Sequence, residues 1–378
     1  MTAERIGLVL AWLAGWSLLW RVPRLRAARL TGSRAAISVI VPARNEGTTL
    51  PTLLAGLLAQ DAPATEIIVV DDDSDDTTAS IAAAAGTRVV RSAALPPGWT
   101  GKTWACWQGA AAARGELLVF LDADTEPGPQ LLDRLAAERA RGGGLVSVEP
   151  YHRMERATER LSAFFNVVSW MGIGAASARR RRRVTGAFGP CLVISRRDYL
   201  GVDGHRAVRG SVLEDVALAR HCHDAGLPVR CFGGRGSVQF RMYPDGIRHL
   251  IEGWSKNIAA GAGSTPIVRT LLVFAWITAT ITVGTAAVSG SLALITGATG
   301  PSFVVWGFYA LWVVQLGVML RALGNFGVGS IVGFPVSVAV FVLIFVRSMF
   351  LTAVRRKVVW KGRSIPVRPG RPAADEAS

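Results

Sequence analysis

Residues 116–124 read ELLVFLDAD, an apolar run that continues directly into two aspartates. A short apolar run without helical spacing is typical of a strand that is buried on both faces of a sheet. Residues 36–41 (AISVIV) and 66–70 (EIIVV) have the same character, and the second run continues into three aspartates at 71–73. We therefore expect buried strands whose carboxyl ends carry acidic side chains.

Helical patterns separate these strands along the chain. We expect strands at 36–41, 66–70, 87–91, 116–121 and 145–148, and helices at 48–59, 77–85, 103–114 and 127–141. Strands that alternate with helices favour an α/β fold with a Rossmann-like, mostly parallel sheet. Ligands of such sheets bind beyond the carboxyl ends of the strands, and both aspartate clusters are placed there.

The composition excludes a disordered chain and an ordinary soluble enzyme. Of the 378 residues, 50% are hydrophobic and 18% are charged, whereas a typical soluble protein is ~25% charged. Residues 270–354 contain only two charged side chains, Arg321 and Arg347. Within them lie three apolar stretches that are each close to the length needed to cross a bilayer, at 271–289, 301–320 and 331–354.

The N-terminal run 6–20 is also apolar, and arginines follow it. Because it lacks a cleavage-site pattern, we expect an uncleaved anchor with its C-terminal flank in the cytoplasm. The chain then divides into an anchor with a basic flank (1–30), a soluble domain (36–265), transmembrane helices (268–354) and a basic, disordered tail (355–378). This layout predicts a multi-pass protein of the cytoplasmic (inner) membrane with its soluble domain in the cytoplasm.

The sequence is compatible with either three or two C-terminal membrane spans. Three C-terminal spans would place the basic residues at 355–363 outside the cell, against the positive-inside tendency. The glycine-rich segment 324–335 is a candidate break. Two spans and a re-entrant segment would keep the C-terminus in the cytoplasm, and we favour that arrangement.

The formal net charge of +15 suits an anionic membrane surface or a phosphorylated substrate. Residues 161–183 combine an apolar segment with an arginine run, which indicates an interfacial helix and a basic cluster that meets anionic headgroups, or else a solvated loop. No nucleic-acid-binding motif accompanies the arginines, so a nucleic acid partner is not expected. Four cysteines are too sparse for a disulfide framework.

Three acidic groups are candidates for chemistry, each with a plain structural alternative. Asp122 and Asp124, spaced i, i+2 after a strand, suit a divalent cation that completes its shell with phosphate oxygens, or they are turn residues. The triplet at 71–73 suits a hydrogen bond to a base or ribose, or a helix N-terminus. The pair Glu214 and Asp215 suits a general base, or a helix start.

Two further features involve tryptophan. The glycine-flanked loop 98–102 contains Lys102, which suits a phosphate, and Trp99, which suits the face of a base or sugar, although a plain surface loop has the same composition. Trp254 lies just before the first apolar stretch, as an interfacial anchor or an acceptor-site residue.

Four motifs together resemble a known family. Residues 38–46 (SVIVPARNE), 70–77 (VDDDSDDT), 120–124 (FLDAD) and 213–215 (LED) have the order and spacing of family 2 glycosyltransferases of the GT-A fold. The resemblance covers roughly residues 36–260. The loop at 98–102 and the apolar tail look like membrane-bound members that glycosylate lipids, most similar to the carotenoid and terpenoid branch of the diaponeurosporenoate type.

The resemblance implies roles in donor binding. Asp72 would hold the uracil ring of a UDP-glucose-like donor, in a nucleotide pocket lined by Pro42, Ala43 and Glu46. In the same comparison, a metal site on the donor diphosphate would be formed by Asp122 and Asp124, with Mg²⁺ or Mn²⁺ as the cofactor.

The resemblance also implies an inverting transfer to a lipid acceptor. Asp215 would deprotonate the acceptor with Glu214 beside it, while the metal and Lys102 offset charge on the leaving diphosphate. The Gln-x-x-Arg-Trp motif of processive polysaccharide synthases is absent, and 253–257 read GWSKN instead, which counts against a polymerase. Alternative acceptors are polyprenyl phosphate and a ceramide or hopanoid lipid, and a non-enzymatic alternative is a catalytically silent nucleotide-sugar-binding subunit.

Overall fold

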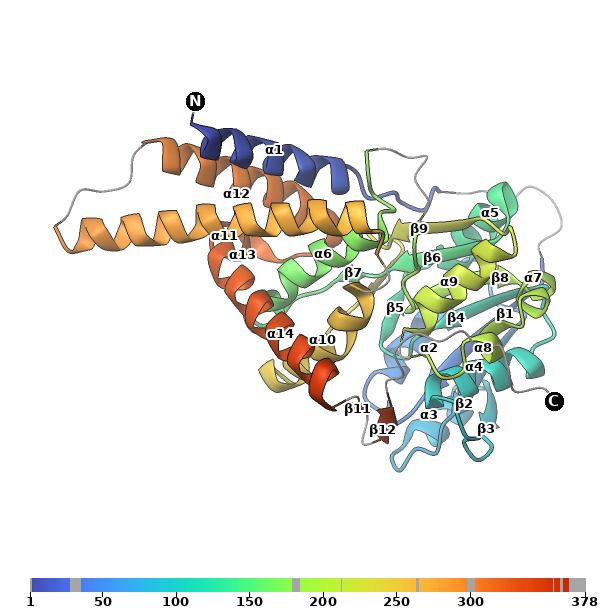
Figure 1. Cartoon of the computed structure of the whole chain (residues 1–378). Helices are drawn as coiled ribbons and strands as arrows, with labels where there is room; N and C mark the ends of the chain where they lie inside the picture. The colour runs from blue at the N-terminus through green and yellow to red at the C-terminus, as the bar shows by residue number, and fades with distance from the viewer. Residues whose placement is uncertain are drawn as a thin grey trace, which may run out of the picture.

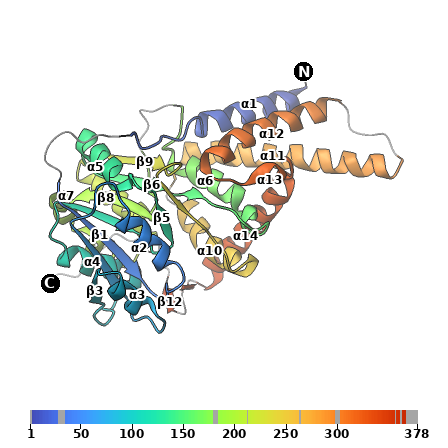
Figure 2. The same ribbon diagram turned by 180° about the vertical axis from the view of Figure 1, so that it is seen from behind.

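The computed structural model describes residues 2–27, 35–178, 184–211, 213–262, 265–297, 303–355, 357–360 and 363–366. Figure 1 shows two parts, an α/β domain around a large sheet and a bundle of long helices beside it. The same division is visible from behind in Figure 2. The predicted α/β class with additional apolar C-terminal helices is therefore confirmed.

The main sheet has seven strands in the order β3-β2-β1-β4-β8-β6-β9. They are β1 (Ile37–Ala43), β2 (Glu66–Asp71), β3 (Arg88–Arg91), β4 (Leu117–Leu121), β6 (Leu145–Glu149), β8 (Cys191–Ser195) and β9 (Val229–Gly233). All five predicted strands are present. The sequence did not predict β8, which is inserted between β4 and β6 and pairs antiparallel with both of them.

Helices cover both faces of this sheet, so β1 and its neighbours are buried on both sides. The helices of the α/β domain are α2 (Leu50–Leu58), α3 (Thr78–Ala84), α4 (Gly101–Ala112), α5 (Leu131–Gly142), α7 (Arg196–Gly201), α8 (Gly204–Ala207) and α9 (Glu214–Asp224). On β1, Val39 packs in the cluster that includes α2 and α5, whereas Ile40 packs in the cluster that includes α4 and α9. A Cβ on Gly109 of α4 would lie 2.4 Å from Ile40, so a glycine permits this close approach.

A second sheet connects the α/β domain to the helical bundle. Its strands are β5 (Thr125–Pro127), β7 (Tyr151–His152) and β10 (Val238–Phe240), with β10 in the middle. Since β5 begins directly after Asp124 and β7 contacts the end of α12, this sheet joins the aspartate-bearing loop to the bundle.

The bundle contains the apolar helices. Its elements are α1 (Ala3–Leu18), the 3₁₀ helix η1 (Glu159–Ser162), α6 (Ala163–Ile173), α10 (Ile247–Ala262), α11 (Ile267–Ile295), α12 (Phe303–Leu323), α13 (Gly327–Val332) and α14 (Phe334–Arg355). Among the described residues, three helical segments are long and apolar enough to cross a membrane, Ile267–Ile295, Phe303–Leu323 and Phe334–Leu351.

A buried polar network ties three of these helices together. Trp276 Nε1 on α11 donates to Gln315 Oε1 on α12 at 2.8 Å, and Gln315 Nε2 donates to the carbonyl oxygen of Trp12 on α1 at 2.8 Å. Side chains of this kind hold helices together where the surroundings offer no water. A Cβ on Gly15 would lie 2.4 Å from Trp276 Nε1, so α1 can pack here only with a glycine at that position.

The described part of the segment 161–183 packs against other helices of the bundle, and its place at a bilayer interface stays a prediction. Phe164 of α6 stacks on Trp276 at 5.2 Å between ring centroids, and Phe165 stacks on Trp254 of α10 at 4.8 Å. An apolar helix can be buried in a protein interior or in the acyl chains of a bilayer. Amino-acid composition does not distinguish these two environments. The arginine run at 179–183 lies outside the described residues.

The segment from α13 to the end of α14 begins beside the second sheet and ends beside α10. At its start, the backbone N–H of Asn325 donates to the carbonyl oxygen of His152 at 3.1 Å. Near its end, Arg347 Nη1 donates to Ser255 Oγ and Ser348 Oγ donates to the Ser255 carbonyl oxygen, both at 2.6 Å. The glycine-rich segment 324–335 contains the breaks between α12, α13 and α14, and the number of membrane spans stays a prediction.

The tail expected to be disordered contains a short antiparallel pair, β11 (Lys357–Trp360) and β12 (Arg363–Pro366). Figure 1 shows this pair after the end of α14, beside the α/β domain. The remainder of the tail lies outside the described residues.

We predict that the C-terminus and the α/β domain lie on one side of the membrane, opposite the N-terminal end of α1. Single cysteines introduced as Ser80→Cys and Ser378→Cys should react with an impermeant maleimide only after cells are lysed. Thr2→Cys should react in intact cells and serves as the matched control. The four native cysteines are buried, so their background labelling is low. Labelling of Ser378→Cys in intact cells would show that α14 crosses the membrane.

Candidate active site

The side chain of Lys102 lies at the centre of the candidate site. Lys102 Nζ is 2.8 Å from Asp122 Oδ1 and 3.0 Å from Glu214 Oε1. The three residues come from the first turn of α4, the loop after β4 and the first turn of α9. Desolvation would lower the pKa of Lys102, but the carboxylates of Asp122 and Glu214 outweigh it and hold this pKa well above its usual value. The ammonium is therefore charged at physiological pH.

The start of α4 is fixed by a capping box that positions Lys102. Thr100 Oγ1 accepts a hydrogen bond from the backbone N–H of Thr103, and Thr103 Oγ1 is close enough to bond to the Thr100 N–H in return. The carbonyl oxygen of Arg209 accepts from the Thr100 N–H at 2.9 Å and from Thr103 Oγ1 at 2.7 Å. These bonds hold the segment before α9 against the head of α4, which explains how Lys102 meets Glu214.

Asp215 lies beside this ion cluster. Burial raises the pKa of Asp215 to about 7, and the negative charge of Glu214 adds to the rise, while Lys102 opposes it. A Cβ on Gly189 would lie 3.3 Å from both Asp215 Oδ2 and Lys102 Nζ, so the backbone passes close to both groups. A carboxylate with a pKa near neutrality can hold and release a proton at physiological pH.

Asp124 lies among other acidic side chains. Burial raises the pKa of Asp124 to about 7, and the charges of Asp122 and Glu46 add to the rise. In the described part of the chain, no three side chains of His, Cys, Asp or Glu gather closely enough to hold a metal ion alone. Two crowded carboxylates fit a cation that takes its remaining oxygens from a diphosphate, as a hard divalent ion commonly does.

The loops after β1 and β2 bind each other at the same sheet edge. The backbone N–H of Asp72 donates to the carbonyl oxygen of Ala43 at 2.8 Å, and Arg44 Nη1 donates to the Asp72 carbonyl oxygen at 2.8 Å. The backbone N–H of Asn45, whose φ is 54°, donates to Ser74 Oγ at 3.0 Å. The two loops therefore form one rigid wall.

The four residues expected in the nucleotide pocket lie on or beside this wall. Pro42 and Ala43 end β1, and the carboxylate of Glu46 accepts a hydrogen bond from Thr49 Oγ1 at 2.8 Å. Asp72 is only 6% exposed. The structure thus brings these residues to the edge that also carries Asp122 and Asp124.

The two candidate tryptophans lie in different surroundings. Trp99 packs edge-on against Trp104 at 4.9 Å between ring centroids, just before Lys102 in the chain. Trp254 is 7% exposed within the bundle core and lies 6.4 Å from the ring of Tyr243. Burial, with a contribution from the charge of Asp124, raises the pKa of Tyr243, so Tyr243 connects the surroundings of Trp254 with the acidic cluster.

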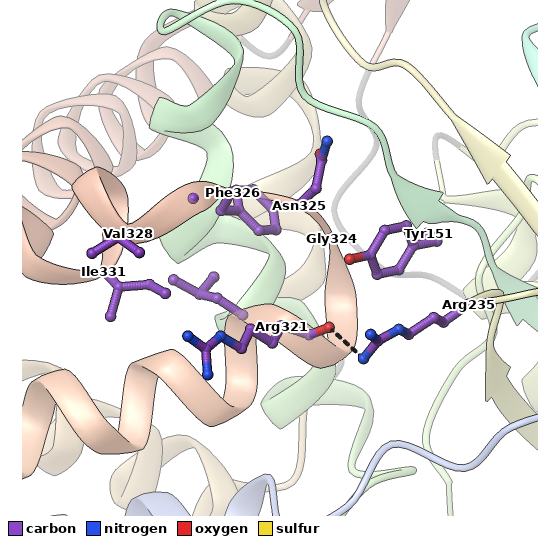
Figure 3. Close-up of a pocket in the computed structure, with 10 residues that line it drawn as sticks. Tyr151, Arg235, Arg321, Gly324, Asn325, Phe326, Val328 and Ile331 are labelled. Atoms are coloured by element: carbon purple, nitrogen blue, oxygen red, sulfur yellow. Dashed lines mark hydrogen bonds between the residues drawn. The ribbon is translucent and has the colours of Figure 1, made fainter.

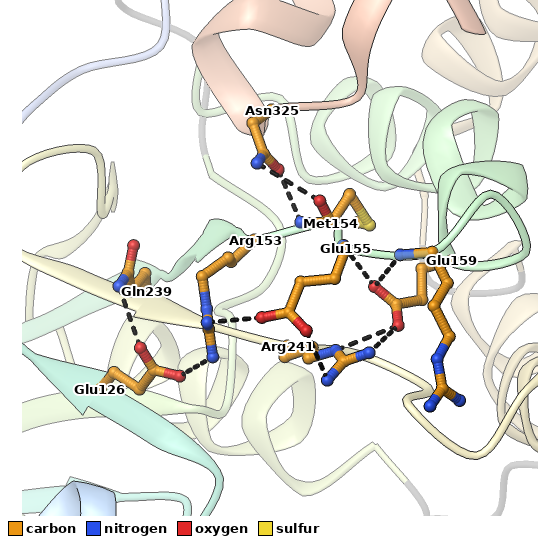
Figure 4. A network of polar contacts seen from close by, with 9 residues as sticks. Glu126, Arg153, Met154, Glu155, Glu159, Gln239, Arg241 and Asn325 are labelled. Carbon is orange, nitrogen blue, oxygen red and sulfur yellow. Dashed lines mark hydrogen bonds and ion pairs between the residues drawn. The ribbon is translucent and has the colours of Figure 1, made fainter.

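A chain of ion pairs extends from the aspartate loop toward the bundle (Figure 4). Arg153 binds Glu126 of β5 and Glu155, each at 2.6 Å, and Arg241 binds Glu155 at 2.8 Å and Glu159 at 2.6 Å. Glu159 is buried, and although burial would raise its pKa, hydrogen bonds from Arg241 and from backbone N–H groups hold that pKa below its usual value.

The same network reaches the apolar helices of the bundle through the side-chain amide of Asn325. The backbone N–H of Met154 donates to Asn325 Oδ1 at 2.6 Å, at the junction between α12 and α13. The position of the loop that carries the candidate metal ligands is therefore connected to the position of α12.

Comparisons with known proteins identify the family. The model of Glycosyl transferase family 2 matches residues 38–201. The 4,4'-diaponeurosporenoate glycosyltransferase of Staphylococcus haemolyticus (strain JCSC1435) is 34% identical over 341 residues, which cover 88% of this chain and 89% of that protein. The chain belongs to glycosyl transferase family 2. The protein of the same name from Staphylococcus aureus (strain USA300) is 31% identical, with 91% of this chain and 92% of that protein covered.

The fold of this glycosyltransferase is also found in solved structures. A mannosyltransferase from Pyrobaculum calidifontis, solved in complex with GDP-Man and Mn²⁺, has a TM-score of 0.51 and 18% identity, and covers 92% of this chain and 96% of its own. The expected GT-A type of fold is confirmed. The expected membership of family 2 is likewise confirmed, as is the expectation of an enzyme.

Sequence reasoning missed several residues of the glycosyltransferase site. Gly189 and the carbonyl group of Arg209 carry no pattern that marks them, because their role depends on which segments meet in space. Tyr243 has a positive φ of 59° and follows a short strand that the sequence did not predict.

We predict that Gly189→Ala lowers the kcat of the glycosyltransferase by about 10- to 100-fold, because small displacements of reacting groups have effects of this size. The new methyl group would contact Asp215 and Lys102 while the backbone keeps an ordinary φ. The melting temperature should change little. Gly201→Ala is the control, since no atom lies within 4 Å of its Cβ position. An unchanged rate for Gly189→Ala would contradict this description of the site.

Proposed function

We propose that this glycosyltransferase moves a sugar from a nucleoside-diphosphate donor, UDP-glucose or a close analogue, to a carotenoid-type or other terpenoid lipid. The observation that carries the proposal is the contact of Lys102 with both Asp122 and Glu214, with Asp215 alongside. This cluster combines a cation for a leaving diphosphate with a carboxylate that can accept a proton. The names of the relatives support the acceptor class.

The donor nucleotide is proposed to bind against the wall formed by the loops after β1 and β2. Asp72 would accept hydrogen bonds from the uracil ring, and Pro42, Ala43 and Glu46 would line the remainder of the pocket. The carboxyl ends of β1, β2 and β4 meet at this edge, which is where ligands of such sheets bind.

Asp122 and Asp124 are proposed to hold Mg²⁺ or Mn²⁺. Burial raises the pKa of Asp124 to about 7 and the charges of Asp122 and Glu46 add to the rise, which supports a cation beside these carboxylates. When bound, such an ion would neutralise charge on the donor diphosphate.

The residues of this chain are proposed to perform a single displacement. Asp215 takes the proton of the acceptor oxygen while that oxygen attacks the anomeric carbon. The bond from the anomeric carbon to the diphosphate breaks on the opposite face, so the configuration inverts. Lys102 stays protonated and offsets the negative charge that grows on the departing diphosphate.

The acceptor is proposed to reach this cluster from the membrane side of a cytoplasmic active site. Trp254, near Tyr243, has a buried indole N–H without an acceptor among the described residues. A polar lipid head could supply one, while Trp99 at the head of α4 offers an aromatic face for a sugar. The apolar helices α11, α12 and α14 would hold the enzyme in the bilayer.

We predict that Asp215→Asn reduces transfer to a hydroxyl-bearing lipid by at least about 100-fold, which is the usual range for removal of a general base. The wild-type rate should rise with pH through about 7, because Asp215 must lose its proton before it can accept another. Donor binding, measured by calorimetry, should be retained in the variant. The matched control is Asp224→Asn, at an exposed carboxylate on the same helix.

Full transfer by Asp215→Asn would contradict the role of a base. It would indicate an acceptor that is already ionised, such as a carboxylate with a pKa of about 4 or a phosphate, which needs no proton removed. A fall of the wild-type rate above pH 7 would contradict it as well.

We predict that a chelator abolishes transfer and that Mn²⁺ or Mg²⁺ restores it. Asp124→Asn should raise the metal concentration needed for half-maximal activity by at least about tenfold, since a ligand with full charge is lost. Calorimetric titration with Mn²⁺ and UDP measures this directly. Full activity of the chelated enzyme would contradict the metal site, and preference for GDP-mannose over UDP-glucose would contradict the donor.

A further inference from the structure

A cavity of about 200 Å³ lies where the second sheet meets the junction of α12 and α13 (Figure 3). It lies apart from the Lys102 cluster, and its lining includes Tyr151 of β7, Arg235 from the turn between β9 and β10, and Arg321 in the last turn of α12. Apolar side chains of α13, Val328 and Ile331, complete the side toward the bundle.

The polar side of this cavity is positively charged. No ion pair among the described residues involves the guanidinium group of Arg235 or Arg321. Arg235 Nη1 donates to the carbonyl oxygen of Arg321 at 3.2 Å, and its guanidinium lies 5.8 Å from the ring centroid of Tyr151. A third cation is close, because a Cβ on Gly327 would lie 3.6 Å from Arg160 Nη1.

The apolar side of the cavity continues onto exposed helix surface. Val328 and Val332 of α13 are 66% and 46% exposed, and Val318 of α12 is 51% exposed. Arg321 is the only charged residue of α12, and it lies at the end of that helix that contacts the α/β domain. The charged side of the cavity therefore lies at the level where a bilayer would change from acyl chains to headgroups.

We propose that this cavity binds the phosphate group of an anionic membrane phospholipid, with the acyl chains along the exposed valines of α12 and α13. Arginine pairs with phosphate oxygens through charge-assisted hydrogen bonds, and no carboxylate in the described part of the chain pairs with Arg235 or Arg321. The cavity has cationic side chains on one side and exposed apolar side chains on the other. A lipid contacts both sides, through its phosphate and its acyl chains, whereas a soluble anion contacts only the cationic side. The site is independent of the donor and acceptor sites proposed above.

The test uses the full-length protein purified in detergent and the double variant Arg235→Gln/Arg321→Gln. Native mass spectrometry during titration with phosphatidylglycerol should show binding about 30-fold weaker in the double variant, because each arginine near an anionic lipid contributes about a fivefold factor. Arg91→Gln/Arg197→Gln removes two exposed arginines of the α/β domain as a matched control and should bind like the wild type.

Two measurements separate a lipid from other anions. Phosphatidylcholine should bind more weakly than phosphatidylglycerol, and inorganic phosphate should not displace the lipid. Equal lipid binding by the double variant and the wild type would overturn the proposal, as would complete displacement by inorganic phosphate. Melting temperatures recorded without added lipid should agree between the variants, so a loss of binding cannot be attributed to unfolding.

Discussion

The ammonium group of Lys102 holds together three segments that are far apart in the sequence. It binds a carboxylate from the loop after β4 and another from the head of α9, while its own helix starts at the capping box of Thr100. Without this cation, Asp122, Glu214, Asp215 and Asp124 would repel one another at the sheet edge. Burial raises the pKa values of Asp124 and Asp215, and the neighbouring carboxylates add to the rise even with Lys102 present. Such a site fits the metal-bound diphosphate proposed above.

The second sheet connects the loop that carries Asp124 with the helical bundle. β5 follows Asp124 directly, and the ion pairs of Arg153 and Arg241 connect it with η1 and the end of α12. In the membrane arrangement proposed above, such a connection would keep the reacting groups at a fixed height relative to the bilayer. Within the bundle, α14 is bonded to α10 through Arg347 and Ser348.

Much of the fold follows from local patterns, whereas the arrangement of segments does not. Three apolar runs predicted β1, β2 and β4 because burial on both faces requires continuous apolar sequence. An apolar run does not show whether its strand is parallel or antiparallel to its neighbours. The direction of β8 therefore could not be predicted from the sequence. An apolar run also does not reveal that α6 packs against Trp276 and Trp254, because helices and lipid offer the same apolar contact. The candidate carboxylates were visible as motifs, but their contact with Lys102 depends on long-range packing.

Transfer of a sugar to a terpenoid lipid is the central proposal for this glycosyltransferase. Mass spectrometry of lipid extracts tests this directly, in a carotenoid-producing host with and without this chain and with Lys102→Met as the inactive comparison. We expect a carotenoid or related terpenoid whose mass is increased by one hexose, present only with the unaltered chain. An unchanged lipid profile together with a new polysaccharide, or an equal yield from Lys102→Met, would contradict the account.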